Sequence, residues 1–349
     1  MLLSVIIPTL NEAENLPVLL QDLRKQERVK LEIIIGDGGS TDETHSVAER
    51  FGTRFVAARR GRGTQMNAAA EQATGDYLLF LHADSSIDDP ALLINALSAL
   101  ISRQFSHERV AGHFRLRFKR TTNKNAMSYR YAEEKTAFNR VNTTNGDQGL
   151  LLARSFFNYL GGFDESMPFL EDQRIAEKIR AEGNWITLPG VLNTSARRFE
   201  KEGFHRRYIL MSMMMGLHSV GVESFFVRAP GVYRNQLDTG TLLLSPFFAL
   251  IWRMMYDEWG AYGTLRIFYL LGRYIRQNSW QMFFFLDVWW QPEIGERRYP
   301  CLNFHDRVFW PCTNFKISDA ITGILCFAWF MGILSPFFWI KDRSKQKIR

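Results

Sequence analysis

The sequence predicts an α/β fold with a doubly wound, mostly parallel sheet, followed by a hydrophobic helical region. Two observations lead to this prediction. Short apolar runs rich in Val, Ile and Leu alternate four times with helical segments over residues 3–81, a pattern typical of a parallel sheet with helices on both faces. Apolar and aromatic residues then become denser beyond about residue 205. We therefore expect an α/β domain over residues 1–235 and a helical region over residues 236–349.

The first β-α unit has the plainest signature. Residues 3–7 are a short β-branched apolar run that Pro8 ends, as expected of a buried strand leading into a loop. Asn11 precedes Glu14, and leucines recur at helical spacing as far as Leu23. This spacing predicts an amphipathic helix with a polar start.

Later segments repeat this alternation. The sequence GDGGSTDET follows the second predicted strand and is a glycine-rich turn with helix-capping residues. The remaining elements are predicted as strands at 31–35, 55–57 and 77–81, helices at 44–51, 65–73, 89–102 and 175–181, and an extended stretch at 113–118. Ligands of a doubly wound sheet bind at the loops beyond the carboxyl ends of the strands, so we expect a site there.

Composition and charge argue against several classes of function and site. The formal net charge of +7 suits nucleic acid, an anionic membrane or a phosphorylated substrate. No Lys/Arg run with interleaved aromatics forms a recognisable nucleic-acid module, so we expect no nucleic-acid partner. Three cysteines without CxxC spacing indicate neither a disulfide framework nor a zinc site. The N-terminus lacks the basic segment of a secretion signal, so we expect the first domain to stay in the cytoplasm.

Two aspartates follow predicted strands directly. Asp37 lies among three glycines, where a backbone can approach a nucleotide closely, but an Asp that stabilises a tight turn has the same local sequence. Asp84 lies at a strand tip, where it could hold a divalent cation whose shell is completed by phosphate oxygens. The neighbouring His82 is not counted as a ligand, because a lone His near a strand end is more often packed or hydrogen-bonded.

Two further segments carry charged residues ahead of helices. RRGRGTQMN, at 59–67, combines arginines and glycines where backbone amides and guanidinium groups can hold a diphosphate, although such loops are commonly just solvated. Glu171 and Asp172 precede the helical pattern at 175–181. One of them could act as a general base, since neighbouring carboxylates raise each other's pKa. The alternative is that both acids simply favour a helix start.

Six segments, taken in order, give the chain a resemblance to a known family. They are SVIIPTLNE, IIIGDGGSTD, GRGTQMNAAAEQATGDYLLFLHADS, GDQGLLLARSFFNYLGGFDE, FLEDQRIAEKIRAEG and TSARRFEKEG. Over residues 3–235 the chain resembles the family 2 glycosyltransferases of GT-A fold, and it is most similar to a bacterial subgroup with a His-Ala-Asp motif. The resemblance implies an inverting transfer of a sugar from a nucleotide-diphosphate donor, with a divalent cation, Mg²⁺ or Mn²⁺, as cofactor.

The resemblance also implies roles for individual residues. Asp172 would be the catalytic base, and Asp84 would hold the metal. His82 replaces the first acid of the commoner two-acid motif, which removes a negative charge beside the metal. GDQG, at 146–149, matches the family without a firm role. The nucleotide-sugar would contact Pro8, Thr9, Glu12, Asp37, Arg60, Arg62, Arg197 and Arg198, and the acceptor side would include Gly161, Gly162 and Glu171.

The last third of the sequence predicts membrane association. Residues 320–340 carry no charge and are long enough for a membrane-spanning helix, with tryptophans suited to the interfaces. Residues 242–256 and the segment WQMFFFLDVWW are too short or too charged to span and suit interfacial helices. LSPFF occurs twice, and each proline is expected to kink a helix. The basic tail, 341–349, and the first domain both belong on the cytoplasmic side, so we expect re-entrant or interfacial helices.

Together these features predict sugar transfer to a hydroxyl on a membrane-embedded or lipid-linked acceptor, at the cytoplasmic face of the cell membrane. A polyprenyl-phosphate acceptor is the alternative. Two other functions stay open. One is a nucleotidyltransferase, although those enzymes usually have a GxGTR-like loop after strand one, where this chain has PTLNE. The other is a catalytically silent membrane scaffold.

Overall fold

The computed structural model describes residues 1–166, 169–234, 236, 240–291 and 298–346, so the end of the basic tail, 347–349, lies outside the described residues. The chain forms two compact units, Met1–Ala196 and Arg197–Arg349. The first unit ends before residue 235 because the helices after Ala196 pack against the C-terminal helices. The functional end of the catalytic domain at residue 235 stays a prediction.

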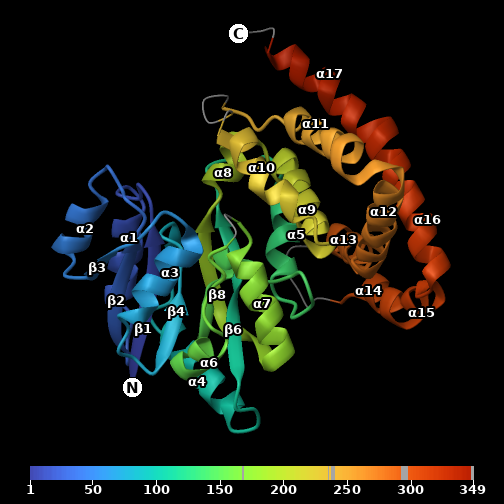
Figure 1. Ribbon diagram of the computed structural model, residues 1–349. Coiled ribbons are helices and arrows are strands. Elements are labelled where there is room, and N and C mark those ends of the chain that lie inside the picture. Colours follow the sequence, from blue (N-terminus) through green and yellow to red (C-terminus); the bar gives the residue numbers. More distant parts are fainter. Residues whose placement is uncertain (167–168, 235, 237–239, 292–297, 347–349) are drawn as a thin grey trace. The chain divides into compact units, whose positions relative to one another are not determined.

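An eight-stranded sheet forms the centre of the first unit (Figure 1). Its strand order is β3-β2-β1-β4-β7-β6-β8-β5. The strands are β1 Leu2–Thr9, β2 Lys30–Asp37, β3 Arg54–Ala57, β4 Tyr77–Phe80, β5 Ser85–Ser86, β6 Val110–Lys119, β7 Leu150–Ala153 and β8 Asn184–Ser195. β1 to β4 are parallel, as predicted.

The second half of this sheet differs from the prediction. β7 runs antiparallel to β4 and to β6, and β5 runs antiparallel to β8, whereas β6 and β8 are parallel. The sheet is therefore mixed: β1, β2, β3, β4, β6 and β8 run in one direction, and only β7 and β5 run in the opposite direction. The sheet is thus mostly parallel, as expected, but the two antiparallel strands were not predicted. β7 and β5 have four and two residues, and segments this short do not encode their direction.

Helices cover both faces of the sheet, as a doubly wound fold requires. One hydrophobic cluster packs α1, α2 and α4 against the sheet, and the other packs α3, α6 and α7 on the opposite side. The helices are α1 Leu16–Arg24, α2 Thr44–Arg50, α3 Arg62–Glu71, α4 Leu92–Gln104, α5 Ala126–Lys135, α6 Arg154–Tyr159 and α7 Glu171–Glu182. The predicted helices in this unit are confirmed. Helix α7 begins earlier than expected, so Glu171 and Asp172 lie inside it.

Helix α3 lies directly against the carboxyl ends of β1 and β2. The Gln65 side-chain amide donates hydrogen bonds to the carbonyl oxygens of Thr9, at 2.6 Å, and of Gly36, at 3.0 Å. A Cβ atom at Gly36 would lie only 2.3 Å from the carbonyl oxygen of Gln65. Glycine at this position therefore lets the helix approach the strand closely.

The Asp37 carboxylate closes the turn that follows β2. Its Oδ1 accepts hydrogen bonds from the hydroxyls of Thr9 and Ser40, at 2.8 and 2.5 Å. Its Oδ2 accepts from the backbone N–H groups of Gly39 and Ser40, at 2.9 and 2.8 Å. Burial alone would raise the pKa of Asp37, but these hydrogen bonds outweigh burial and hold the pKa below its ordinary value.

The second unit is helical throughout the part of it that the structure describes (Figure 1). Its helices are α8 Arg197–Glu202, α9 Phe204–Ser219, α10 Glu223–Arg234, α11 Ser245–Met254, α12 Gly260–Gln277, α13 Trp280–Trp290, α14 Pro300–Phe304, α15 Trp310–Thr313, α16 Lys316–Trp329 and α17 Ser335–Gln346, with π-helical turns at Met255–Trp259, His305–Phe309 and Phe330–Leu334. Among the described helices, only Lys316–Ser344, with 29 residues and a mean hydropathy of 1.9 over its most apolar 18 residues, is long and apolar enough to cross a membrane.

A helix kink was predicted at the proline of each LSPFF segment, and this prediction is wrong for the first segment. Pro246 lies in the first turn of α11, where a missing N–H removes no helical hydrogen bond, so the predicted kink there is wrong. Pro336 lies inside the helix Lys316–Ser344, called the long helix below, and follows the π-helical turn Phe330–Leu334. A proline inside a helix removes an i→i−4 hydrogen bond, and a π-helical turn accommodates that loss.

The long helix packs closely on α12 through two glycines. A Cβ atom at Gly323 would lie 2.5 Å from the carbonyl oxygen of Phe268, and one at Gly272 would lie 2.4 Å from the backbone nitrogen of Gly323. The two backbones are therefore in direct contact at this crossing.

We predict that Asp37→Asn lowers the free energy of unfolding by about 1–3 kcal/mol at pH 7, because the amide cannot accept all four hydrogen bonds. A depressed pKa stabilises the fold above the unfolded-state pKa, at about pH 4, and this stabilisation disappears as the pH falls through the folded-state pKa. The loss should therefore shrink toward pH 3. Urea unfolding at the two pH values measures it, with exposed Asp76→Asn as control. An equal loss at both pH values would contradict this account.

A second prediction uses two glycines of the same long helix. Gly323→Ala should lower the free energy of unfolding by about 1–3 kcal/mol, because the new methyl meets the backbone of Phe268. Gly332→Ala should leave it unchanged or raise it by up to about 1 kcal/mol, because nothing lies within 4 Å of the added atom. Denaturation in detergent compares the two variants, and equal effects would show that the helices do not pack as described.

Candidate functional site

A small pocket lies at the carboxyl end of β4, within the first unit. Its ionisable side chains are Arg62 from α3, His82 from the loop after β4, and Glu171 and Asp172 from α7. Its remaining wall is mostly apolar and aromatic, including Phe80. The pocket thus joins residues that lie far apart in the sequence at the edge of the sheet where the fold class predicts a ligand.

The Arg62 guanidinium lies among several carboxylates. Its Nη1 donates to Glu171 Oε1 at 3.1 Å, and the Glu171 side chain is only 6% exposed. Desolvation alone would lower the pKa of Arg62, but the charges of Glu171, Asp172, Asp147 and Asp84 raise it above its ordinary value. Burial raises the pKa of Glu171, while Arg62 opposes this rise and Asp172 adds to it. All four carboxylates therefore act on one guanidinium.

Asp172 is held in the first turn of α7. Its Oδ2 accepts a hydrogen bond from the Gly146 N–H at 2.7 Å, and its Oδ1 accepts one from the Gln173 N–H at 2.9 Å. The side chain is half-buried and lines the pocket. This position at a helix start agrees with the sequence, and the role of Asp172 as a base stays a prediction.

His82 pairs with a residue that the sequence left without a role. Its Nδ1 lies 2.6 Å from Asp147 Oδ1. Asp147 belongs to the GDQG segment, which forms a short 3₁₀ turn over Gly146–Gln148. The match of GDQG to the family was the only sign of this contact in the sequence. His82 is therefore hydrogen-bonded, as the more common alternative for a lone His near a strand end expects.

Gln148 fixes the GDQG turn from inside the domain. It is fully buried, and its Oε1 accepts a hydrogen bond from the Asn145 N–H at 2.7 Å. Its amide donates to the Phe114 carbonyl oxygen at 3.2 Å and lies 2.9 Å from His113 Nδ1. Burial lowers the pKa of His113 to about 4, so this imidazole is neutral at pH 7. The turn that supports Asp172 is thus anchored by neutral hydrogen bonds.

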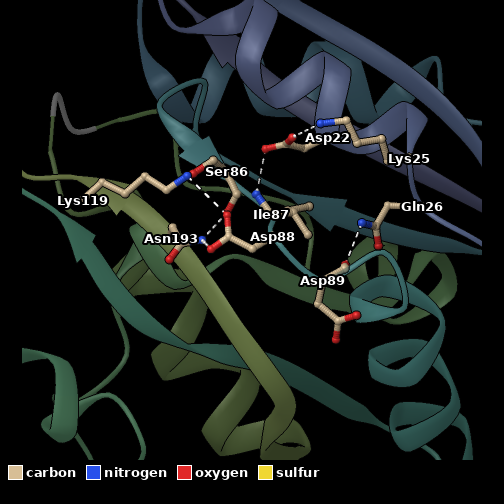
Figure 2. A network of polar contacts seen from close by, with 9 residues as sticks. All are labelled: Asp22, Lys25, Gln26, Ser86, Ile87, Asp88, Asp89, Lys119 and Asn193. Carbon is tan, nitrogen blue, oxygen red and sulfur yellow. Dashed lines mark hydrogen bonds and ion pairs between the residues drawn. The ribbon is translucent and has the colours of Figure 1, made fainter.

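Asp84 presents a carboxylate without a local partner. It is half-buried and makes no hydrogen bond or close ion pair with any described residue. The segment after it is held in place by the network in Figure 2, where the Ile87 N–H donates to Asp22 at 3.0 Å and the Asn193 amide donates to Asp88 at 2.9 Å. The neighbouring chain is therefore fixed while Asp84 itself is left available to a ligand.

The side chains near Asp84 supply enough ligands for a cation only if a bound phosphate supplies others. Within the described ranges, no group of three or more His, Cys, Asp and Glu side chains is arranged to hold a metal. Asp84 supplies one oxygen ligand of the type that Mg²⁺ and Mn²⁺ prefer. His82 is engaged with Asp147. Further oxygen ligands would have to come from the bound phosphate.

The predicted nucleoside residues gather around the ends of β1 and β2. Pro8 pairs in register with Gly36, and Thr9 is buried and bonds to Asp37. Glu12 accepts a hydrogen bond from the Asn15 side chain at 2.6 Å. The carboxylate of Asp37 already accepts four hydrogen bonds, which is the turn-stabilising alternative that the sequence left open. Arg60 is exposed on the loop before α3. Contact of these residues with a nucleoside stays a prediction.

Gly161 and Gly162 form the turn after α6, with φ values of 74° and 70°. Asn67 of α3 holds this turn: its Oδ1 accepts from the Phe163 N–H and its Nδ2 donates to the Phe163 carbonyl oxygen, each at 2.9 Å. The turn thereby places Phe163 in the pocket wall. A role of this turn in acceptor binding stays a prediction.

The basic pair Arg197 and Arg198 begins α8, and both residues are exposed. They belong to the second unit, which is described by itself. In the first unit, Thr194 of β8 pairs with Ser85, the residue after Asp84. The chain therefore leaves the first unit from a strand that ends beside the Asp84 turn.

The chain is similar to several known proteins over part of its length. Residues 4–156 match the family described as Glycosyl transferase family 2. A PGL/p-HBAD biosynthesis glycosyltransferase of Mycobacterium bovis (strain BCG / Pasteur 1173P2) is 43% identical over 91 residues, which cover 24% of this chain and 36% of the relative. The poly(ribitol-phosphate) beta-N-acetylglucosaminyltransferase TarS of Staphylococcus aureus (strain Mu50 / ATCC 700699) is 31% identical over 98 residues, covering 26% of this chain and 17% of the relative.

A solved structure is similar over most of the chain. The mannosyltransferase PcManGT from Pyrobaculum calidifontis, in complex with GDP-Man and Mn²⁺, is 18% identical, covers 92% of this chain and 86% of its own, and has a TM-score of 0.46. The curated relatives are matched over little more than a third of their length at most. The similarity to this family is therefore confined to residues 4–156, which lie within the first unit.

Proposed function

We propose that this protein is an inverting glycosyltransferase of GT-A type that moves a sugar from a nucleotide-diphosphate donor to a hydroxyl on a membrane-embedded or lipid-linked acceptor. One observation carries the proposal. Arg62 and the helix-borne acid Asp172 line the pocket at the end of β4, and the acid Asp84 lies close enough for its charge to raise the pKa of Arg62. A base, a cation ligand and a phosphate-binding cation are the groups that this transfer needs.

In the proposed reaction, Asp172 takes the proton of the acceptor hydroxyl as that oxygen attacks the anomeric carbon. A new carbon–oxygen bond forms there, the bond to the diphosphate oxygen breaks on the opposite face, and the nucleoside diphosphate leaves with the bonding electrons. The hydrogen bond from Gly146 and the N–H of Gln173 hold the Asp172 carboxylate in one orientation. A fixed base avoids reorganisation during attack.

The negative charge that develops on the leaving diphosphate is the second requirement. Arg62 lies in the pocket, and Arg60 and the pair Arg197 and Arg198 are further candidates to contact the donor. A divalent cation at Asp84 would neutralise leaving-group charge when bound. Pro8, Thr9, Glu12 and Asp37 are proposed to form the nucleoside end, and Glu171, Gly161 and Gly162 the acceptor side.

The proposed location is the cytoplasmic face of the cell membrane. The helix Lys316–Ser344 is apolar and only 17% of its most apolar window is buried. A hydrophobic surface on the same chain as a donor pocket suits an acceptor that stays in the lipid phase. Transfer of labelled sugar from UDP- or GDP-sugars into lipid extracts tests this, and release of pyrophosphate instead of nucleoside diphosphate would indicate a nucleotidyltransferase.

We predict that Asp172→Asn lowers turnover by roughly 10²–10⁴-fold with little change in donor affinity, because the amide cannot take the hydroxyl proton. Steady-state transfer and donor titration measure the two effects. Glu177→Gln, on the exposed side of the same helix, is the matched control. Near-normal turnover in a folded, donor-binding variant would exclude a hydroxyl acceptor and favour a polyprenyl phosphate, which needs no base.

We further predict that Asp84→Asn lowers Mn²⁺ affinity in the presence of nucleoside diphosphate by about 10- to 100-fold or more, because a charged oxygen ligand is lost. Mn²⁺ binding followed by electron paramagnetic resonance gives a readout that does not depend on turnover. Asp89→Asn, which alters an exposed aspartate in the loop after β5, is the control. Unchanged Mn²⁺ binding in Asp84→Asn would remove this residue from the cation site, and absence of any donor binding by the wild type would favour a silent scaffold.

A further inference from the structure

Two long helical segments of the second unit pack side by side and antiparallel (Figure 1). One consists of α11, a π-helical turn and α12, and the other is the long helix Lys316–Ser344. Contacts between them run from end to end: the Leu244 N–H donates to Asp342 at 3.0 Å, and Arg276 donates to Asp319 at 2.5 Å. The rings of Phe248 and Phe338, and of Phe268 and Phe327, make contacts between these ends.

This pairing decides whether the long helix can cross a bilayer. Phe330, at the middle of Lys316–Ser344, contacts both Phe248 and Phe268. The partner segment between those two phenylalanines carries Arg253, Asp257, Glu258 and Arg266, all exposed. A crossing would therefore place exposed charges at the level of the bilayer centre, where charged side chains are costly. The packed pair is unsuited to cross.

Both segments of the pair carry exposed apolar side chains. On the long helix, the exposed fractions are 63% for Leu325, 61% for Ile333 and 64% for Ile340. On the partner, Trp252, Tyr256 and Leu265 are exposed, and each is followed directly by an exposed charged residue. Successive residues of a helix point about 100° apart. Each of these charged side chains therefore points away from the apolar side chain before it, so the apolar side chains can enter an interface while the charged ones stay in water.

Basic charge is concentrated in the same unit. Residues 197–349 contain 20 Lys and Arg against 12 Asp and Glu, whereas residues 1–196 contain 23 against 24. At the end of the long helix, the Arg343 guanidinium lies 3.6 Å from the ring centre of Trp339, and the Lys341 ammonium lies 5.1 Å from that of Phe337. Basic groups beside aromatic rings suit the headgroup level, and an excess of positive charge suits anionic lipids.

We propose that the second unit docks on an anionic bilayer surface, with the helix Lys316–Ser344 lying in the plane of the interface and not crossing the membrane. The exposed apolar residues of the helix pair enter the lipid, and the charged side of α11 and α12 stays in water. This orientation accounts for an apolar helix whose ends are tied to buried arginines, Arg276 and Arg206, of the same unit. It deepens the proposed location but does not depend on the transfer reaction, because vesicle binding needs no donor.

Flotation of the full-length protein with vesicles tests the docking. Binding should be stronger to phosphatidylcholine vesicles that contain phosphatidylglycerol than to pure phosphatidylcholine, and should weaken in high salt. The double variant Leu325→Glu with Ile333→Glu should lower binding by at least about tenfold, because two apolar side chains no longer enter the lipid. The matched control is Phe105→Glu with Val141→Glu, which alters two exposed apolar residues of the first unit.

Depth measurements distinguish lying in the interface from crossing. Spin labels are placed singly at Ile321, Leu325, Ile333 and Ile340 in a variant whose three cysteines are replaced by alanine. In the proposed orientation, all four labels have the same shallow depth, and a label at Arg266 stays accessible to a water-soluble relaxation agent. A depth that rises to a maximum near the middle of the helix and falls again would overturn the proposal.

Two other results would also overturn it. The first is absence of binding to either kind of vesicle. The second is self-association in sedimentation experiments that is lost in the Leu325→Glu, Ile333→Glu variant while vesicle binding is unaffected, because a second copy of the chain would then cover the apolar surface. Circular dichroism of each variant confirms that the helices are retained, and the substituted positions are exposed.

Discussion

The close seating of α3 against the ends of β1 and β2 is the constraint on which the pocket depends. Gly36 leaves room for the helix backbone, and Gln65 ties the helix to both strands. From this fixed position, α3 reaches three separate parts of the first unit: Arg62 bonds to Glu171 of α7, Thr64 bonds to Glu165, and Asn67 holds the turn after α6. A displacement of α3 would move the guanidinium and loosen the opposite wall of the pocket together.

The charges around Arg62 bear on the proposal that a phosphate-bearing donor and a cation bind together. Glu171, Asp172, Asp147 and Asp84 all raise the pKa of Arg62, so several carboxylates surround one guanidinium. A nucleoside diphosphate would add further negative charge, and a guanidinium already paired with Glu171 does not offset it. In the proposed function, a divalent cation at Asp84 would supply positive charge there.

The second unit contains a long apolar helix, Lys316–Ser344, whose most apolar window is only 17% buried. Backbone contact at Gly272 and Gly323 and the buried pairs Arg276–Asp319 and Arg206–Asp342 hold this helix along one side only. Removing one partner of such a pair leaves an uncompensated buried charge, so the pairs favour a single arrangement of the two long segments. What is left exposed is a surface that water solvates poorly and a bilayer interface solvates well.

The sequence by itself determined the local elements and the residue types of the site. The runs at 3–7, 31–35 and 77–81 form strands because most of their apolar side chains are buried in the sheet. Asp84 follows a strand and Asp172 lies at a helix start, as their flanking residues predict. Only the tertiary structure decided the antiparallel direction of β7, the pairing of His82 with Asp147, and the tethering of Asp172 by Gly146. It also decided that charged residues of α11 and α12 lie beside the apolar helix. These features join segments far apart in the chain, and no local periodicity or propensity records which distant segments meet.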